Sequence, residues 1–561
     1  MSRRSIIAAL AASFTALVLH CVNLAGGGGS EWEAKITGRA EYDGSGLPVA
    51  GARVVICPER FLRDTSGIPD DSTARALRET VTDKEGFFSA DRLEPGVVHI
   101  EINDKQSWGS LSECEISGNS AGRAIACVLK PIGRIHGTLA FPAGYQGSAF
   151  VQVYGLDRIV RAAPDGSFVL SDIPEGNYTL RVLLSRTEYL SKNVGPVAVA
   201  TNAETDLGAL AVPLNGGAWS GKRRIYLNTS VTGANVAGDV VDFPVLVRLN
   251  SGNFDFSQAQ ATGADIRFTK SDTTLLPCEI ERWDPAIGAA EIWVKVDTVQ
   301  GNDSTQSITM YWGNPDASST SNGPSVFDTT AGFAGVWHLG ESSGGIHDAT
   351  DDRFDGTRNG NPTRIAGDIG YAQSFSGSGD FIEMGNVCNP DTSGFTVCAW
   401  IKPALVNSNQ TIVSKSHGGS PSSSYGWLLE LDNTGGLMAF IATGAGSWGA
   451  SRTFVLGSTI QIVDSTVWHH IAAVFVRSGN DKCRLYIDGT EVSSLPAGGD
   501  ITSLSAVVNS APLRLGADAN GGCPWKGSMD ECSVSLTVRS PDWIRLCYMN
   551  QKQNDKMVIL R

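Results

Sequence analysis

A pair of related segments in the first half of the chain restricts the fold more than any other feature. Residues 82–98 (TDKEGFFSADRLEPGVV) and 162–178 (AAPDGSFVLSDIPEGNY) share one spacing of glycine, phenylalanine and aliphatic residues. In each copy an acidic residue precedes a glycine, Gly86 or Gly166, and a phenylalanine follows two positions later. Acid–glycine pairs favour tight turns because glycine accepts positive φ. The pattern therefore predicts two copies of one small β-unit, each with its phenylalanine in a core.

The two copies resemble carboxypeptidase regulatory-like domains, which are small transthyretin-like sandwiches. Residues 36–56 (ITGRAEYDGSGLPVAGARVVI) are similar to the first two strands of that family and their loop, and residues 133–139 (GRIHGTL) open the second copy. The resemblance implies sandwiches over 32–130 and 131–214 that act as a spacer or stalk and have no chemistry of their own.

The composition favours short strands joined by turns. Glycine accounts for 64 of the 561 residues, and charged residues make up 18%, below the usual share of about 25%. Long coiled coils need more charge, and disordered chains lack the 42% of hydrophobic residues found here. The formal net charge is −14 and lysine and arginine do not cluster, so nucleic acid is not expected as a partner.

The N-terminal residues indicate export. A basic start precedes an apolar segment, residues 5–19, which has the length of a signal-peptide core and is too short to span a bilayer. We expect a signal peptide over 1–20 and a flexible tether over 21–31 that begins with Cys21. This arrangement resembles a bacterial lipoprotein signal, which implies a lipidated Cys21, membrane contact through the lipid only, and a place at the outer membrane or cell surface. The alternative is an ordinary cleaved signal peptide and a secreted protein.

The cysteine count agrees with an oxidising compartment. Of 11 cysteines, ten remain once Cys21 is set aside, and Cys278, in a strand-like run, is a candidate free thiol. Close spacing suggests the disulfides Cys114–Cys127, Cys388–Cys398 and Cys523–Cys532, although spacing does not determine connectivity.

The middle of the chain, residues 215–328, carries dense strand signals after the linker Asn215-Gly216-Gly217. In the run 291–297 (EIWVKVD) the aliphatic residues share one face, and Trp293 shares the other with polar residues. The segment resembles an uncharacterised exported β-domain that commonly precedes concanavalin A-like modules in bacterial surface proteins. Its signature pieces are FPV at 243–245, ADIRF at 264–268, LPCEIE at 276–281 and YWGN at 311–314.

Three acids of this segment, Glu279, Glu281 and Asp284, are weighed as catalytic acids. Glu279 and Glu281 lie two apart in a predicted strand, so their side chains share a face and could act as a pair. The preferred interpretation is a polar strand face exposed to solvent, because no chemistry of the resembled family supports catalysis.

The C-terminal part, residues 329–561, resembles the laminin G-like, concanavalin A-like jelly roll. The pieces that carry the resemblance include VWHL at 336–339, VWHHIAAVFV at 467–476, CRLYIDGTEV at 483–492 and WKGSMDECSV at 525–534. Asp488-Gly489 is a candidate type I′ hairpin turn. Ser540 and Pro541 predict a short helix over about 541–550. The polar tail after it is expected to fray.

This domain lacks the sequence signals of catalysis. Glucanases of the same fold use a Glu-x-Asp-x-x-Glu run, which is absent from 331–561. Asp530 and Glu531 are adjacent, which places them on opposite faces of a regular strand. His469 and His470 are interpreted as strand residues, one packed inward and one facing outward. We therefore expect no enzymatic activity.

Binding residues are expected in the loops of the jelly roll. The resemblance to laminin G-like domains implies one Ca²⁺ ion at a sheet rim, and the matching loop carboxylates are Asp348, Asp380 and Asp530. The alternative is three turn aspartates that accept local backbone hydrogen bonds. Trp448, in GAGSWGAS, is the best loop candidate for stacking on a sugar, and the preferred alternative is a rim residue that covers the sheet edge.

The prediction is an all-β, multidomain surface protein: small Ig/transthyretin-like sandwiches, then a β-sandwich, then a concanavalin A-like jelly roll. The leading function is non-catalytic binding of polysaccharide or a cell-surface glycan through the jelly roll. One alternative is a structural or adhesive envelope protein with a protein partner. The other is a diverged glycan-cleaving enzyme.

Overall fold

The computed structural model describes most of the chain after the predicted signal and tether. The described residues are 34–63, 78–117, 123–142, 145–271, 273–404, 408–417, 425–443, 453–478, 483–494, 497–498 and 500–561. Cys21 and Trp448 lie outside them. Strands dominate the described residues, which confirms the all-β prediction. No helix among them has the length and apolar character needed to cross a bilayer.

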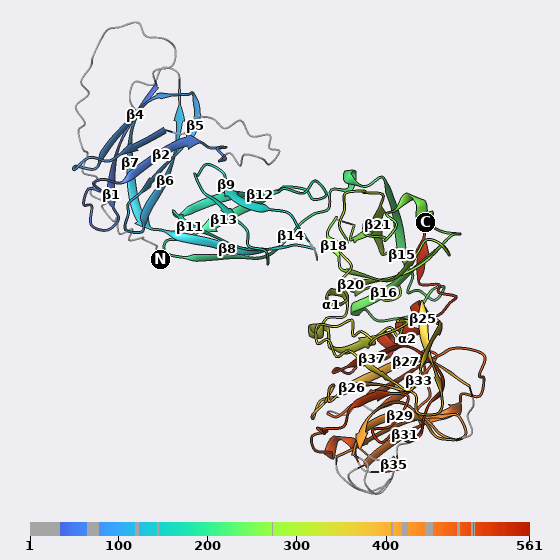
Figure 1. Cartoon of the computed structure of the whole chain (residues 1–561). Helices are drawn as coiled ribbons and strands as arrows, with labels where there is room; N and C mark the ends of the chain where they lie inside the picture. The colour runs from blue at the N-terminus through green and yellow to red at the C-terminus, as the bar shows by residue number, and fades with distance from the viewer. Residues whose placement is uncertain are drawn as a thin grey trace, which may run out of the picture.

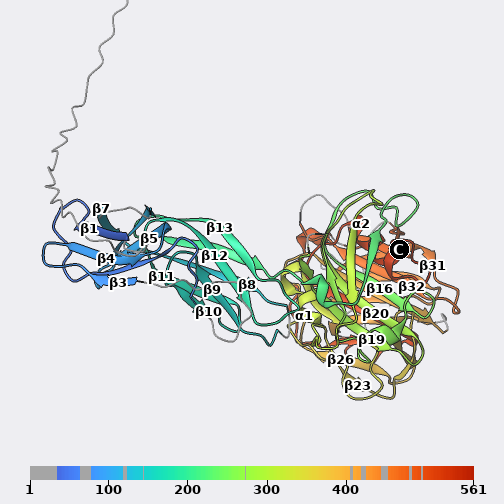
Figure 2. The ribbon, with the colours of Figure 1, turned by 90° about the horizontal axis from the view of Figure 1, so that it is seen from above.

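The two sequence repeats correspond to two sandwiches of the same strand order, which lie in a row in Figure 2. The first is one seven-stranded sheet, in the order β3 (Arg78–Val81), β2 (Arg53–Pro58), β5 (Gly96–Asn103), β6 (Trp108–Ile116), β7 (Arg123–Pro131), β1 (Ala34–Tyr42), β4 (Phe87–Leu93). The second has two sheets, β10 (Ile159–Arg161), β9 (Ala149–Val153), β12 (Gly176–Leu184), β13 (Lys192–Val199), and β11 (Ser167–Ile173), β8 (Gly133–Ala140), β14 (Glu204–Ala211). In both, the first strand pairs with the last in parallel.

The repeated residues occupy equivalent places in these sandwiches. Phe88 and Phe168 are buried, with 5% and 3% of their surfaces exposed. Gly86 and Gly166 adopt φ of 81° and 87°. A Cβ at Gly166 would lie 2.0 Å from the carbonyl oxygen of Leu139, so these turns require glycine. The turn and core roles predicted from the repeat are therefore confirmed.

The middle region has two facing sheets. One is β18 (Leu275–Leu276), β17 (Arg267–Thr269), β21 (Ser307–Trp312), β15 (Gly221–Leu227), β38 (Val558–Leu560); the other is β16 (Val240–Asn250), β20 (Ala289–Val299), β19 (Cys278–Asp284). The last strand of the chain thus belongs to a middle sheet, and Ile225 pairs with Leu560. The expected fraying of the tail is wrong at this point, because the apolar run Val-Ile-Leu extends the free edge of β15.

The C-terminal part is a jelly roll of two large sheets, lowest in Figure 1. The first is β24 (Thr363–Ala366), β25 (Tyr371–Ser376), β37 (Lys526–Ser535), β27 (Phe395–Pro403), β32 (His469–Phe475), β33 (Arg484–Ile487), β34 (Thr490–Glu491), with β22 (Phe333–Trp337) also on β37. The second is β23 (Thr357–Asn359), β26 (Phe381–Gly385), β36 (Leu513–Leu515), β28 (Gln410–His417), β29 (Tyr425–Leu431), β30 (Gly436–Ala442), β31 (Thr453–Gln461), β35 (Ala497–Gly498).

Helices are few and short in the described residues. The longest is α2 (Pro541–Gln551), where the Ser540 side chain accepts a hydrogen bond from the Trp543 amide, as the sequence predicted. The others are α1 (Gly323–Val326) and the 3-10 turns η1 (Gly216–Ala218), η2 (Phe256–Gln258), η3 (Thr329–Ala331) and η4 (Ile501–Ser503). Asp488 and Gly489 both have positive φ, 52° and 68°, as a type I′ turn requires.

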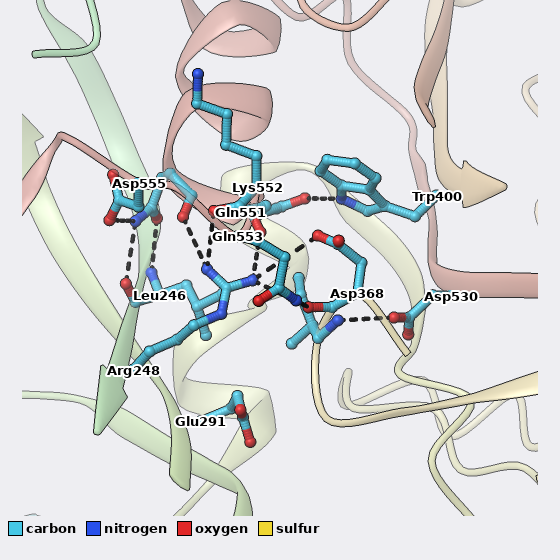
Figure 3. Close-up of polar contacts among 12 residues, drawn as sticks. Leu246, Arg248, Glu291, Asp368, Trp400, Asp530, Gln551, Lys552, Gln553 and Asp555 are labelled. Carbon is cyan, nitrogen blue, oxygen red and sulfur yellow. Dashed lines mark hydrogen bonds and ion pairs between the residues drawn. The ribbon is translucent and has the colours of Figure 1, made fainter. Parts of the chain in front are cut away.

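Helix α2 fastens the jelly roll to the middle region. Asn550 exchanges two hydrogen bonds with the backbone of Leu246 on β16, at 2.7 and 3.0 Å. Figure 3 shows Arg248 of the same strand directed at the end of the helix, where its guanidinium donates to the carbonyls of Asn550, Gln551 and Lys552. Buried side chains from 225 to 557 form one continuous hydrophobic cluster. The middle region and the jelly roll therefore share a core.

Candidate ligand groove and buried acidic cluster

A groove of about 800 Å³ lies between β19, at the edge of its sheet, and the segments that follow β22 in the jelly roll. Its walls include exposed or half-buried polar side chains: Asp284, Ser321, Asn322, Glu341, His347 and Arg353. Glu279, Glu281 and His338 also line it. The groove exists only because the two regions pack together, since each supplies one wall.

His338 lies between carboxylates from both regions. Its Nε2 is 3.3 Å from Oε2 of Glu279, and its Nδ1 is 2.9 Å from both carboxylate oxygens of Glu531. The same Nδ1 is 3.8 Å from Oε2 of Glu281, which accepts a 2.9 Å hydrogen bond from Nε1 of Trp293. The imidazole stacks on the Trp293 indole with ring centroids 5.8 Å apart. The histidine of the jelly roll is thus held by glutamates of both regions.

Burial and charge alter the ionisation of this cluster. Burial alone lowers the pKa of His338, but the carboxylates of Glu531 and Glu279 outweigh it and hold that pKa well above its usual value. Burial and the charge of Glu531 raise the pKa of Glu281. Burial, Glu531 and Glu281 likewise raise the pKa of Asp530. The cluster therefore favours the charged form of the His338 imidazole and the protonated forms of Glu281 and Asp530.

A β-bulge explains how two adjacent acids reach one cluster. The register between β27 and β37 shifts in the stretch opposite Glu531, and Glu531 itself has a left-handed φ of 49°. The charges of Asp530 and Glu531 consequently both act on Glu281. The expectation that these two acids lie on opposite faces is wrong, because strict alternation holds only in a regular strand and a bulge adds a residue.

Part of the polar face of β20 is covered, although Asp297 farther along it is exposed. Glu291 is 6% exposed and Trp293 is 1% exposed, because the jelly roll covers this face. Glu291 is paired with Arg282, whose Nε and Nη2 lie 2.6 and 2.7 Å from its carboxylate oxygens. Glu279 and Glu281 do share a face, as predicted, but that face meets His338 rather than bulk water. The solvated interpretation is therefore corrected.

The three aspartates expected to bind calcium are not brought together. Asp348 accepts from three backbone amides and the Thr350 hydroxyl at 2.8–3.0 Å, and Asp380 accepts from two backbone amides at 2.7 Å. Asp530 accepts from the Ile369 amide at 2.9 Å. Within the described ranges, one group of His, Cys, Asp or Glu has ligand atoms all within 4.8 Å of one another: Glu281, His338 and Glu531. Asp348 and Asp380 accept local backbone hydrogen bonds, as in the turn interpretation, whereas Asp530 is a strand residue that accepts from a distant amide.

The structure has the six candidate disulfide cysteines as free thiols. Ser112 Oγ lies 3.6 Å from Sγ of Cys127, and Cys114 is buried in the same core. Cys388 contacts the carbonyl of Ala334 at 3.5 Å, whereas Cys398 lies beside Ser533 and Arg539. The Cys523 carbonyl accepts from Thr411 on β28, whereas Cys532 lies on β37 of the other sheet. Cys523 and Cys532 thus occupy different surroundings, whereas Cys388 and Cys398 both lie near enough to Cys532 to act on its charge. Cys278 is a free, buried thiol, as predicted.

The tandem histidines of β32 have structural surroundings. His470 is 1% exposed, packs 5.4 Å from the Trp400 ring, and has its pKa lowered to about 4 by burial. His469 is half-buried, and its Nδ1 lies 2.9 Å from Asp488. One ring is packed inward and the other lies at the turn.

Sequence reasoning passed over His338 and Glu531 as binding residues. His338 follows a buried strand directly, and Leu339 beside it has a left-handed φ of 63°. A polar residue at the end of a buried strand is a signal that could have selected His338. No sequence signal reveals the bulge at Glu531, because both neighbours are ordinary strand residues.

Two family models match parts of the C-terminal half of the chain. Residues 376–545 match the concanavalin A-like lectin/glucanases superfamily, and residues 262–339 match a domain of unknown function, DUF2341. The search of curated proteins finds no match.

Solved structures resemble the chain only distantly. The binding domain of Paraclostridial Mosquitocidal Protein 1 is 13% identical, with a TM-score of 0.30 over 39% of this chain. The chain spans about half, 52%, of that domain. Domain 4 of AbnA, an arabinanase from Geobacillus stearothermophilus solved with arabinotriose, is 17% identical over 38% of this chain and 97% of its own, with a TM-score of 0.27. The CBM40 of Ruminococcus gnavus IT-sialidase, bound to sialyllactose, is 18% identical over 27% and 81%, with a TM-score of 0.22. The C-terminal part of the chain is a concanavalin A-like jelly roll, preceded by a match to DUF2341.

Proposed function

We propose that the protein is a non-catalytic, cell-surface glycan-binding protein and that its ligand lies in the groove between β19 and the jelly roll. The observation that carries the proposal is the groove itself. Its volume, about 800 Å³, lies within the range of small-ligand sites, about 300–1,000 Å³. Its walls mix donors such as Arg353 and Asn322 with acceptors such as Glu341. Sugar hydroxyls both donate and accept, so a mixed polar wall suits them better than it suits an apolar ligand or a polyanion.

The test is glycan-array binding by the full mature chain and by groove variants. Arg353→Ala and His347→Ala remove exposed side chains of the groove wall, and we expect each to weaken binding by about tenfold, the equivalent of about 1.4 kcal/mol. Arg161→Ala, at an exposed position on β10, is the matched control and should bind like the unmodified chain. Binding that both groove variants retain in full would place the glycan elsewhere.

Two alternatives have different outcomes in the same experiment. An envelope protein captured by the chain, with no glycan bound, would favour the structural or adhesive role. Release of shorter sugars, abolished by Glu279→Gln, would favour glycan cleavage, which is considered because Glu279 and Glu281 both line the groove.

The surface location is proposed from the N-terminal sequence. Lipidation of Cys21 predicts incorporation of labelled fatty acid, and Cys21→Ser should abolish the label. An unlabelled parent chain would contradict the anchor and favour secretion.

A further inference from the structure

The buried cluster below the groove contains more carboxyl groups than cationic partners. Glu279, Glu281, Asp530 and Glu531 surround or adjoin the single imidazole of His338. The nearby Arg282 guanidinium is paired with Glu291, so it neutralises little of the negative charge of the cluster. Carboxylates removed from water need a positive partner or a proton. A cation would satisfy several of them at once.

The geometry of three of these groups suits one metal ion. One ligand atom each from Glu281, His338 and Glu531 lies within 4.8 Å of the other two. The separations from His338 Nδ1 are 2.9 Å to Glu531 and 3.8 Å to Glu281. Two ligand atoms that each lie about 2.0–2.2 Å from one ion are separated from one another by distances similar to these 2.9 and 3.8 Å values. The three atoms could therefore turn toward a common centre with small side-chain movements.

A separate observation also points to a missing ligand. Asp530 is fully buried, at 0% exposure, and its Oδ1 has no hydrogen-bond partner among the residues that the structure describes. Its other oxygen accepts from the Ile369 amide, and its charge acts on Glu281 and Glu531. A buried carboxylate oxygen left without a donor is costly unless something occupies the space beside it.

The backbone is strained at the two jelly-roll ligands. Glu531 has φ of 49°, and Leu339, next to His338, has φ of 63°. Left-handed conformations at residues other than glycine are uncommon and concentrate where function requires them. Here they direct a glutamate and a histidine to the same point from different strands.

We propose that Glu281, His338 and Glu531 bind a divalent first-row transition ion such as Zn²⁺, with Asp530 beside them. The imidazole nitrogen favours this class over Ca²⁺, which prefers oxygen ligands only. Glu281 belongs to the middle sheet and the other two to the jelly roll, so the ion would link the two regions under the groove. The inference does not depend on glycan binding.

The test measures Zn²⁺ binding by the full mature chain after treatment with a chelator. We expect about one Zn²⁺ per chain in competition with a chromophoric chelator, and a rise of several degrees in the melting midpoint of the C-terminal transition. His338→Gln and Glu531→Gln should weaken Zn²⁺ binding by more than about 100-fold, the upper range for loss of a residue that only supports a ligand. Equimolar Ca²⁺ should not compete.

The matched control is Glu430→Gln, which neutralises a buried carboxyl of β29 remote from the cluster. It should bind Zn²⁺ like the parent chain. Absence of Zn²⁺ binding by the parent, or equal binding by Glu531→Gln and the parent, would overturn the proposal. Because binding by the parent is decisive alone, a variant that fails to fold does not remove the test.

Discussion

Two junctions in this molecule are built in opposite ways. The two N-terminal sandwiches have separate cores and meet through ion pairs, Lys130 with Glu175 and Arg158 with Glu101, each at 2.5 Å, and through Leu111, which packs against the second core. The middle region and the jelly roll share one core, and the chain returns from the second to complete a sheet of the first. The difference teaches that position along the chain does not define a folding unit, because the last strand stabilises a sheet that begins more than 300 residues earlier.

The chemistry of the two junctions differs accordingly. At the first, the Lys130 and Glu175 side chains are 39% and 43% exposed, so water screens them, and one pair, Arg158 with Glu101, is largely buried. At the second, Asp530 is buried and Arg248 and His338 are half-buried between the sheets, so protein groups must compensate them. The groove lies only at the second junction, where two regions supply its walls.

Splitting the chain should reveal the largest difference. Separate production of 34–328 and 329–561 should give misfolded or insoluble products, because β15 loses β38 and the shared core is exposed. Separation at 131 should leave a soluble 132–561 fragment. Solubility and near-UV circular dichroism of the fragments measure the outcome of each cut. A soluble, ordered 329–561 fragment would show that the jelly roll does not need the middle region.

A core truncation should have the next largest effect. Trp543 of α2 packs 5.8 Å from Phe243 of β16, so Trp543→Ala should destabilise the C-terminal unit by about 3–5 kcal/mol. Phe88→Ala in the first sandwich should cost a similar amount but shift a different calorimetric transition. If Trp543→Ala separates the middle region and the jelly roll into two transitions, their cores are less coupled than we infer.

Removal of the Arg248 guanidinium should lower the free energy of unfolding by somewhat less than the core truncation does. Arg248→Met leaves the carbonyls at the end of α2 without their donor and Asp368 without its cation, 3.9 Å away, and we expect a loss of about 3 kcal/mol. The control is Arg134→Met, whose pair with Glu204 is more than half exposed on both sides. Urea unfolding followed by tryptophan fluorescence compares the two. Equal effects would contradict the contrast between buried and exposed pairs.

The second junction should also respond to pH. Burial raises the pKa of Asp555 from 3.8 to about 7, so the folded chain keeps a proton that the unfolded chain releases. This contribution to stability is complete below about pH 4 and is lost as the pH rises to about 7. Asp555→Asn should remove that decline, so the difference in unfolding free energy between variant and parent should change with pH. A constant difference from pH 4 to 8 would contradict the assigned pKa.

The smallest effect is expected at the first junction. Lys130→Met removes one partner of an exposed ion pair, and we expect no resolvable change in the melting of either sandwich. The same substitution should also leave the small salt dependence of melting nearly unchanged. A clear loss of stability would show that this junction is more tightly built than its exposure suggests.

Much of the architecture could be predicted locally. The spacing around Gly86 and Gly166 specified two equivalent turns and two buried phenylalanines, because positive φ and side-chain alternation are properties of short segments. Ser540 likewise marked the start of α2. The jelly-roll prediction agrees with the family match over 376–545. These features depend on neighbours in sequence, so the sequence by itself determined them.

The candidate site was decided by tertiary structure. The sequence placed Glu279 and Glu281 on one face but could not tell that the jelly roll, rather than water, would cover it. It placed Asp530 and Glu531 on opposite faces, and a bulge reversed that result. It treated the tail as frayed, although Val558–Leu560 completes a distant sheet. In each case the outcome depends on which surface packs against which, and that is settled by burial summed over the whole chain rather than by the preferences of a few residues.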